Sequence, residues 1–322
     1  MKTKKLGNSD LKITRVGLGA WAIGGAWQFG WGQQDDDDSI ATIHKALDAG
    51  MNWIDTAPAY GLGHSEEIVG KAVKGLSEKP YIFTKCSLVW DEPIKERTVS
   101  NSLKADSIRR EVEGSLRRLQ VEAIDLYQIH WPNPEVDIEE GWETLLELKK
   151  AGKVRWIAVS NFNVAQMEKI GQLAPTTSLQ PPYSAIKRSV ETEILPYCEK
   201  NDIGVIVYSP MQAGMLTGKM SRERIAEMPK DDWRIAHSSD YREPALTRNL
   251  AIQDLFIKVA EEQNVPTPTV AVAWVLKHTA VTAAIVGARR PSQVDGIAPA
   301  LSYEMDDETY QRINQFLSSD AA

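Results

Sequence analysis

The chain has 322 residues, of which 43% are hydrophobic and 25% are charged, and its formal net charge is −7. Such a composition is typical of a globular protein with a sizeable core, and it excludes collagen-like and extensively disordered chains. A negative chain without a basic domain also argues against nucleic acid as a partner.

The sequence gives no sign of export or of a membrane. Residues 1–7 are charged but no apolar stretch follows them, so they do not resemble a signal peptide. No run of 18 apolar residues occurs, which predicts no membrane span. Cys86 and Cys198 are the two cysteines, and we expect free thiols in a reducing compartment. We therefore predict a cytoplasmic protein with no membrane partner, as a monomer or small homo-oligomer.

A short hairpin is expected first, over residues 3–14, because residues 7–10 (G-N-S-D) favour a turn. After it, eight short apolar runs alternate with longer segments of helical period. The predicted strands are residues 16–18, 52–54, 81–84, 124–129, 154–159, 178–179, 203–207 and 283–286. The predicted helices include residues 39–49, 65–74, 107–119, 139–150, 164–173 and 190–200.

Strands that alternate with helices predict a parallel sheet with crossover helices. A doubly wound sheet and a (β/α)₈ barrel both fit, but eight repeats over about 270 residues favour the barrel. We therefore predict an α/β fold, a (β/α)₈ TIM barrel in which residues 1–322 form one domain and the opening hairpin caps the bottom. A long connection after the seventh strand, from residue 208 to about 244, is expected on the active-site face as a lid.

Two motifs suggest other dehydrogenases. Residues 17–22 (G-L-G-A-W-A) fit a Rossmann fingerprint, but a glycine-broken loop follows where that motif needs a helix. Tyr183 and Lys187 have the Y-x-x-x-K spacing of short-chain dehydrogenases, but two prolines directly precede them. We expect an exposed pair on a loop there.

Two further motifs suggest phosphate or metal binding. Residues 214–219 (G-M-L-T-G-K) are one residue short of a P-loop, and Met220 stands where the magnesium ligand belongs. Residues 35–38 (D-D-D-D) lack the alternation of a calcium loop, and they favour the positive N-terminus of the helix expected from Ser39. No histidine pair has metal-ligand spacing and no G-x-S-x-G occurs, so we expect no metal site and no serine hydrolase.

Polar residues stand where successive predicted strands end. In a barrel these positions share one rim, although they are far apart in sequence. A charge at the end of a buried strand is costly unless it is paired or functional. The residues are Asp55, Lys85, His130, Ser160, Asn161, Gln180 and Tyr208.

At these positions the sequence resembles the aldo-keto reductase family over nearly the whole chain. Residues 55–61 (D-T-A-P-A-Y-G), 125–131 (D-L-Y-Q-I-H-W) and 158–162 (A-V-S-N-F) resemble three family segments, with Ala158 where glycine is usual. The resemblance implies a catalytic tetrad of Asp55, Tyr60, Lys85 and His130. It implies reduction of an aldehyde or ketone, or reversibly oxidation of an alcohol, with Tyr60 as proton donor and NADPH as cofactor (NADH being the other option).

The tetrad suits this chemistry. A tyrosine with a pKa near 10 donates a proton poorly unless a cation lowers that value, and we expect Lys85 to do so. Asp55 would keep Lys85 charged, and His130 would orient the carbonyl. The substrate itself is not readable, but we expect Trp21, Trp90 and Trp131 to line its pocket beside Tyr60 and His130.

The resemblance also implies the cofactor contacts. Gly296 and Ile297 depart from the family, which often has Glu-Asn there against the adenine. The residues implied to contact the cofactor are Gly19, Trp21, Asp55, Ser160, Asn161, Gln180, Tyr208, Ser209, Pro210, Met211, Gly214, Leu216, Lys219, Gly287, Arg289, Arg290 and Gln293.

The alternative function is a nucleotide-binding regulatory module, because potassium-channel β-subunits also resemble this family. An intact tetrad does not separate the two functions. Steady turnover with free NADPH would favour the enzyme, and tight nucleotide with little turnover would favour the regulatory module.

Overall fold

The computed structural model describes residues 2–90, 98–230 and 232–319. Eight strands close into a barrel in the order β10-β11-β12-β3-β4-β5-β8-β9, and each pairs in parallel with its neighbours. The predicted barrel is therefore confirmed. Its strands are β3 (Val16–Gly19), β4 (Trp53–Asp55), β5 (Tyr81–Cys86), β8 (Ile124–Ile129), β9 (Val154–Ser160), β10 (Ser178–Gln180), β11 (Gly204–Val207) and β12 (Ala283–Gly287).

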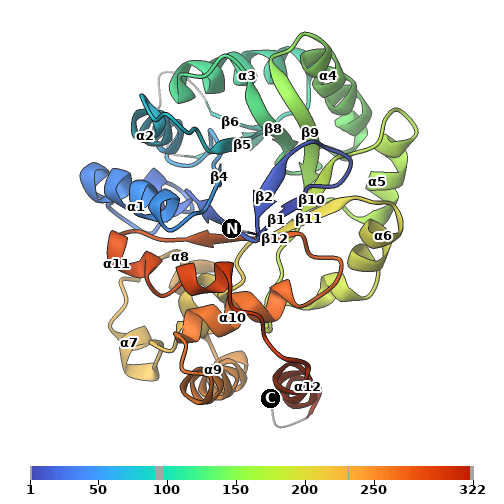
Figure 1. Ribbon diagram of the computed structural model, residues 1–322. Coiled ribbons are helices and arrows are strands. Elements are labelled where there is room, and N and C mark those ends of the chain that lie inside the picture. Colours follow the sequence, from blue (N-terminus) through green and yellow to red (C-terminus); the bar gives the residue numbers. More distant parts are fainter. Residues whose placement is uncertain (1, 91–97, 231, 320–322) are drawn as a thin grey trace.

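Helices surround these strands (Figure 1). They are α1 (Asp36–Asp48), α2 (His64–Val73), α3 (Ala105–Leu119), α4 (Ile138–Lys150), α5 (Val164–Gly171), α6 (Ile194–Lys200), α9 (Ala245–Glu262), α10 (Thr267–Leu276), α11 (Pro291–Val294) and α12 (Asp307–Leu317). That residues 1–322 form one domain stays a prediction.

Two predicted helix starts were wrong. Helix α1 begins at Asp36 and not at Ser39, because the carboxylate of Asp35 accepts the N–H of Asp38 and caps it. The acidic run therefore makes the cap and first turn, where negative charge is favourable. The predicted helix 190–200 is divided into the 3₁₀ turn η3 (Ser189–Glu191) and α6. Pro196 lies in the first turn of α6, where its missing N–H costs no helical bond.

The N-terminal hairpin closes one end of the barrel, as predicted. Strands β1 (Thr3–Lys5) and β2 (Lys12–Thr14) pair antiparallel and lie over the middle of the ring in Figure 1. Leu6 and Leu11 between them are fully buried against barrel-interior side chains such as Phe83. Gly7 has φ +48° in the turn, and a Cβ there would lie 2.1 Å from the carbonyl oxygen of Thr177. Only glycine permits this close approach.

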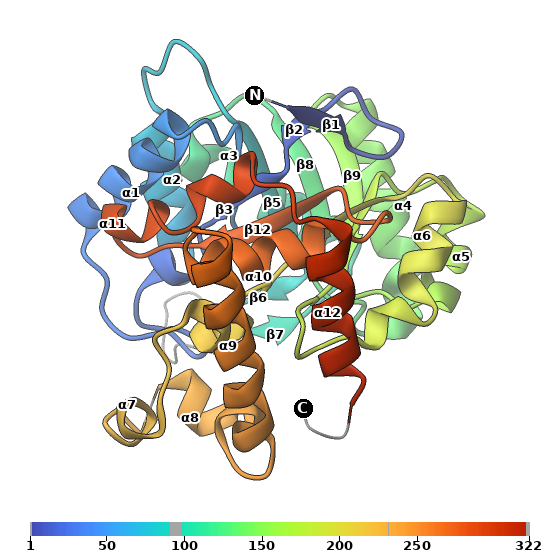
Figure 2. The same ribbon diagram turned by 60° about the horizontal axis from the view of Figure 1, so that its bottom comes forward.

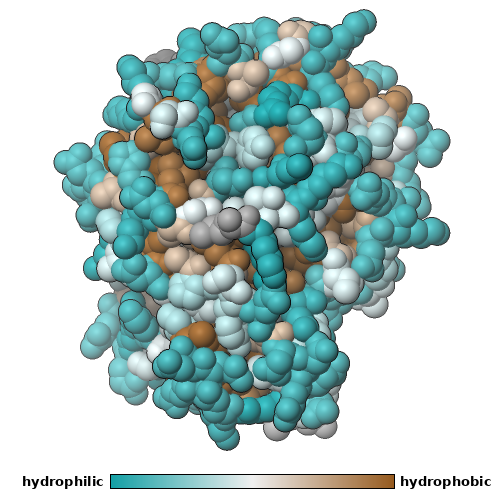
Figure 3. Space-filling model, in the orientation of Figure 1, coloured by the Kyte–Doolittle hydropathy of each residue, from teal (hydrophilic) through white to brown (hydrophobic). Residues whose placement is uncertain are grey.

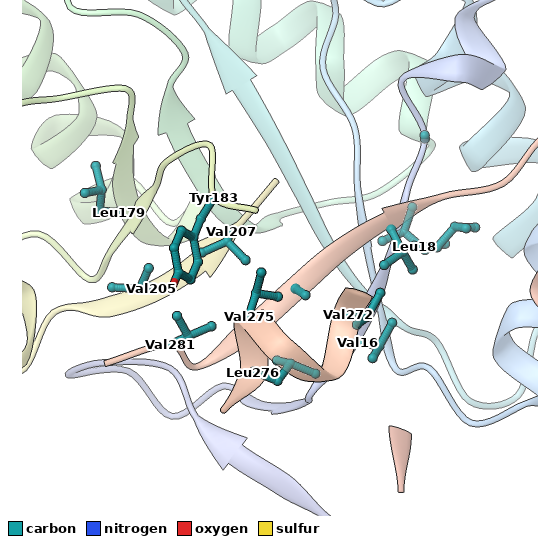
Figure 4. Close-up of a cluster of buried hydrophobic side chains, with 14 of the residues drawn as sticks. Val16, Leu18, Leu179, Tyr183, Val205, Val207, Val272, Val275, Leu276 and Val281 are labelled. Carbon is teal, nitrogen blue, oxygen red and sulfur yellow. The ribbon is translucent and has the colours of Figure 1, made fainter. Parts of the chain in front are cut away.

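A second core lies between the strands and the surrounding helices. Helix α10 is apolar on all sides because it packs between α9 and β12. Figure 4 shows Val272 and Val275 of α10 against Val16 and Leu18 of β3 and Val205 and Val207 of β11.

The long connection after β11 lies at the end of the barrel opposite the hairpin (Figure 2). It contains short helices: η4 (Gln212–Thr217), α7 (Arg222–Ala226), α8 (Trp233–His237) and η5 (Ser239–Tyr241). Buried polar contacts hold it together, since Gln212 Nε2 donates to Asp240 Oδ2 at 2.6 Å and the Tyr241 hydroxyl donates to the Ala213 carbonyl at 2.9 Å.

The structure also decides the competing motifs. A 3₁₀ turn, η1 (Ala22–Gly24), follows β3, so the glycine motif opens no dinucleotide-binding α-helix. Tyr183 and Lys187 lie in a loop, as expected, but Tyr183 is fully buried and donates to Glu191 Oε1 at 2.7 Å. The predicted exposure was confirmed for Lys187 and wrong for Tyr183, because the Tyr183 ring fills core space beside Val207 (Figure 4).

The surface and the thiols agree with the composition. Both cysteines are free and buried. The face that carries the hairpin is mostly hydrophilic, with apolar residues scattered among polar ones (Figure 3). Within residues 2–90, 98–230 and 232–319, no helix is long and apolar enough to cross a membrane, and no three acidic, His or Cys side chains gather as a metal site.

Because Leu11 is fully buried in the hairpin plug, Leu11→Ala leaves a cavity where the barrel is closed. We expect it to lower the free energy of unfolding by about 2–5 kcal/mol in urea denaturation. The control is Val136→Ala, whose side chain is 79% exposed, with an expected change within about 0.5 kcal/mol. Equal stability of the two variants would show that the hairpin does not close the core.

Candidate active site

Lys85 is the centre of a polar cluster at the carboxyl ends of the strands. Its side chain is fully buried in β5, and its Nζ donates to Asp55 Oδ2 at 2.6 Å and to the Thr56 carbonyl at 2.9 Å. It also donates to the Tyr60 hydroxyl at 3.2 Å. Asp55 ends β4, the strand paired with β5, so barrel closure brings the two opposite charges together.

Tyr60 reaches this cluster from the turn between β4 and α2. Gly61 next to it has φ +67°, and a Cβ there would lie 2.0 Å from the carbonyl oxygen of Gly24. The chain therefore needs glycine to bring this turn against the loop after β3. The Tyr60 ring is 8% exposed, so it is nearly enclosed while its hydroxyl faces Lys85.

His130 follows β8 and completes the predicted tetrad. Its backbone N–H donates to the Cys86 carbonyl at 3.0 Å, and its ring lies edge-on to the Tyr60 ring with centroids 5.7 Å apart. Its Nδ1 is buried without a hydrogen-bond partner. Burial and the nearby Lys85 ammonium hold the pKa of His130 well below its usual 6.5, so the imidazole is neutral at neutral pH.

The second oxygen of Asp55 is held by two amides. Gln180 Nε2 donates to Asp55 Oδ1 at 2.9 Å, and Gln128 Nε2 donates to it at 3.2 Å. Gln128 is not among the site residues expected from the sequence. Its signal was present, since Gln128 interrupts an apolar strand two residues after Leu126, which faces the barrel interior.

Burial sets the electrostatics of the cluster. Burial, together with the Asp55 carboxylate, raises the pKa of Tyr60 well above 10. Burial also lowers the pKa of Lys85, and Asp55 opposes this shift. The expected lowering of the Tyr60 pKa by Lys85 was therefore wrong, because desolvation of the phenolate dominates. Tyr60 carries its proton at neutral pH.

Three rim residues extend the cluster along the barrel edge. Ser160 Oγ donates to the Gln180 carbonyl at 2.8 Å, and Asn161 Nδ2 donates to the His130 carbonyl at 3.0 Å. The Tyr208 hydroxyl donates to Asn161 Oδ1 at 2.9 Å. The polar residues expected at strand ends thus meet on one rim, because all eight strands run in parallel.

Aromatic rings line this end of the barrel. Trp131 stacks near His130 at 6.4 Å between centroids and is 39% exposed. Trp21 packs edge-on against Trp31 of its own loop at 5.0 Å and Trp233 of α8 at 6.0 Å.

Two other tryptophans differ from the expected pocket. Trp27 was not expected there, yet its ring centroid lies 6.0 Å from that of Tyr60. Trp90 lies beside Arg118 of α3, with the guanidinium carbon 5.9 Å from the ring centroid. The ring contacts described for the tetrad therefore come from Trp27 and Trp131.

The loop after β11 carries seven of the residues expected to contact the cofactor, and it lies at this same end. Ser209 and Lys219 are exposed, Met211 is half-buried and Pro210 is buried. Leu216 is fully buried in the core, so it can meet a ligand only through its backbone. Gly214 has φ +97°, and its Cβ position has no atom closer than 3.8 Å.

The first and last strands meet beside the rim. Gly19 ends β3 and pairs with Gly287, the end of β12. A Cβ on Gly19 would lie 2.7 Å from Ile285 Cγ2, whereas a Cβ on Gly287 would meet only the Gly19 carbonyl oxygen at 3.9 Å. The backbone at Gly287 is therefore open to close approach.

Arginines gather after β12. Arg289 Nε donates to Gln34 Oε1 at 2.8 Å, and its N–H donates to Gln293 Oε1 at 2.7 Å. Burial lowers the pKa of Arg289, and the guanidinium groups of Arg234 and Arg290 lower it further. The Arg289 guanidinium thus lies close enough to those of Arg234 and Arg290 to be repelled by both. Asp232, which pairs with Arg234 at 2.7 Å, opposes this.

Gly296 and Ile297 depart from the family pattern, and the structure shows where each of them lies. Ile297 is 3% exposed and belongs to the hydrophobic core, so its side chain is not available to a ligand. Gly296 lies between α11 and the next helical turn, and its carbonyl accepts a hydrogen bond from the Thr269 hydroxyl at 3.0 Å.

Comparisons with known proteins show the family of this chain. The family model described as "Aldo/keto reductase family" matches residues 15–318. The chain is 39% identical to aldo-keto reductase YhdN of Bacillus subtilis, over 99% of this chain and 94% of that one. It is 35% identical to an NADH-specific methylglyoxal reductase of Escherichia coli, over 95% of each chain. The solved glycerol dehydrogenase AKR11B4 of Gluconobacter oxydans superposes with a TM-score of 0.90 at 42% identity, covering 98% of this chain and 95% of that one.

Because the pKa of His130 is held below its usual value, its imidazole should remain neutral as pH falls from about 8 to 6. We expect the ring ¹⁵N shifts of His130 to be constant over this range, with the resonance assigned by its loss in His130→Gln. A titration step of that resonance near pH 6.5 would contradict the described environment.

Proposed function

Because this chain belongs to the aldo/keto reductase family and is thus an NAD(P)H-dependent oxidoreductase, we propose that it reduces aldehydes or ketones with NADPH, and oxidises alcohols in reverse. The observation that carries the proposal is the buried contact of Lys85 Nζ with both Asp55 and the Tyr60 hydroxyl. A buried lysine that touches a protonated phenol is suited to proton transfer.

Tyr60 is the proposed proton donor. Its raised pKa keeps it protonated at neutral pH until a stronger base forms beside it. The alkoxide that results from hydride addition to a carbonyl is such a base. When the proton leaves Tyr60, the phenolate lies 3.2 Å from the Lys85 ammonium, which stabilises it. Asp55 keeps that ammonium charged in a buried place.

His130 is the proposed orienting residue. A neutral imidazole carries one N–H, which can donate a hydrogen bond to the carbonyl oxygen without competing as an acid. The ring is fixed edge-on to Tyr60, and its backbone is held on both sides by Cys86 and Asn161. Oxygen bound between Tyr60 and His130 would therefore meet two donors.

The residues present fit a nicotinamide dinucleotide. Ser160, Asn161 and Gln180 place a hydroxyl and two amides at the rim, as a carboxamide requires, and Tyr208 adds an aromatic ring beside Asn161. The open backbone at Gly287 and the loop at Gly214 can approach phosphates. When bound, NAD(P)H supplies the hydride.

We favour NADPH because Arg234 and Arg290 both repel Arg289, and Asp232 offsets only part of this repulsion. A 2′-phosphate among them would relieve this repulsion and accept charge-assisted hydrogen bonds. The Escherichia coli relative is NADH-specific, so family membership alone does not decide the cofactor.

Three-carbon compounds are the proposed first substrates to test. The relatives named for methylglyoxal and glycerol act on small oxygenated molecules. Trp27 and Trp131 beside the tetrad would limit the pocket to compact substrates. A panel of carbonyl compounds assayed by loss of NADPH absorbance tests the proposal. Slow nucleotide exchange with no turnover of any compound would favour the regulatory alternative.

Tyr60→Phe should lower kcat by about 10²–10⁴-fold, because it removes the proton donor and keeps the ring. NADPH binding, followed by fluorescence, should persist. The matched control is Tyr303→Phe, where the lost hydroxyl has no hydrogen-bond partner and lies between the helical segments η6 (Ala298–Leu301) and α12. Near-full activity of Tyr60→Phe would remove Tyr60 from the mechanism.

Arg289→Ala should raise the Kd for NADPH about 10- to 150-fold and leave that for NADH nearly unchanged, because one charge-assisted contact is lost. Arg290→Ala should have a smaller effect, since Arg289 is the one fixed by Gln34. Arg312→Ala, on α12, is the control. Equal weakening of both nucleotides by both variants would overturn the NADPH preference.

A further inference from the structure

Ser87 is a strained, buried link directly after the strand that carries Lys85. It has φ +86°, in the left-handed region that serine rarely adopts. Its carbonyl accepts the Ser102 N–H at 3.0 Å. Its hydroxyl oxygen accepts the Trp131 N–H at 3.2 Å and lies 3.3 Å from the Trp131 carbonyl, to which it donates. Ser87 therefore joins the end of β5 to the chain just after His130.

Glu111 on α3 holds this link from behind. Its Oε2 accepts the Ser87 N–H at 2.9 Å, and its Oε1 accepts the Ser107 hydroxyl at 3.1 Å. Without Glu111, the Ser87 N–H would lose its described partner in a buried turn. An orphaned buried N–H is costly, so the turn would have to move.

Cys86 and Ser87 connect the chain at Lys85 with the chain at His130. Lys85 immediately precedes them, and the Cys86 carbonyl accepts the His130 N–H at 3.0 Å. Ser87 then holds Trp131, the residue after His130. A shift of this turn would therefore change the position of Lys85 relative to His130.

We propose that Glu111 is a positioning residue for carbonyl reduction, which acts through Ser87 to hold Lys85 and His130 in register. This inference rests on the proposed function, because it gives Lys85 and His130 their roles. Glu111 itself touches neither of them by a described hydrogen bond, so its effect passes through the turn.

The surroundings of Glu111 make its hold on Ser87 depend on pH. Burial raises the pKa of Glu111 to about 7, and the Glu66 carboxylate of α2 also raises it. The bonds from Ser87 and Ser107 and the charge of Arg110 oppose this.

Two further ionisable groups that face Glu111 stay neutral at pH 7. Cys86 of β5 and Tyr127 of β8 face it, and the pKa of each is raised well above its usual value by burial and by Glu111. Glu66 is itself paired with Arg118 at 2.7 Å. As pH falls through about 7, Glu111 gains a proton, and its bond from Ser87 is no longer charge-assisted. We therefore expect kcat to fall on the acid side.

The test compares Glu111→Gln and Glu111→Ala in the full chain. Glutamine keeps the size and an acceptor oxygen for Ser87 but carries no charge, so the step near pH 7 should disappear and kcat at pH 8 should lie at the lower level that the wild type reaches on the acid side. Alanine removes the acceptor, so kcat should fall about 5- to 50-fold while KM changes little. Glu113→Gln is the control, because Glu113 is on the same helix but pairs with Lys153. It should keep the wild-type pH profile.

A second measurement does not depend on activity. The ¹⁵N–¹H signal of Ser87, in protein labelled at serine, should shift with a midpoint near pH 7 in the wild type and not in Glu111→Gln. A wild-type kcat without this step, or a step that persists in Glu111→Gln, overturns the inference even if carbonyl turnover is normal. A wild type that turns over no carbonyl compound, with the Ser87 shift present, contradicts the proposed function instead.

Discussion

The buried ion pair between Lys85 and Asp55 is the interaction on which the site depends. Both side chains are almost wholly removed from water, with Nζ and Oδ2 2.6 Å apart. Such a pair is retained only where its remaining polar atoms are satisfied. Thr56 and Tyr60 accept the other hydrogen bonds of Lys85. Gln128 and Gln180 donate hydrogen bonds to the other oxygen of Asp55. A barrel interior that is apolar below and polar at its rim thus supplies these partners from β8, from β10 and from the turn after β4.

The two ends of the barrel differ in polarity. At one end the hairpin fills the interior with Leu6 and Leu11, and the contacts there are apolar. At the other end the interior is polar and the long connections lie over it (Figure 2). The polar rim includes features that cost stability, namely an unpaired His130 Nδ1 and the strained backbone at Ser87.

Loops far apart in sequence complete the ligand-facing end. Trp21 and Trp31 of the loop after β3 pack with Trp233 of α8, and Arg234 lies over the Trp31 ring at 4.9 Å. Arg289 binds Gln34 from a third segment. Contacts between such loops follow no periodicity. Sequence patterns therefore predicted the long connection, and the family resemblance implied Arg289 and Arg290, but neither predicted Trp27, Trp31, Trp233 or the Arg289–Gln34 contact.

The sequence by itself determined the barrel, the hairpin and the strand-end residues, because alternating apolar runs and turn residues are local signals and parallel strands end on one rim. The family resemblance added the tetrad, which the structure brings together around Lys85. Only the tertiary structure decided the direction of the Tyr60 pKa shift, the burial of Tyr183 and Leu216, and the role of Gln128 beside Asp55. Desolvation and packing depend on what surrounds a side chain in space, and the partners of these residues lie on other strands and helices.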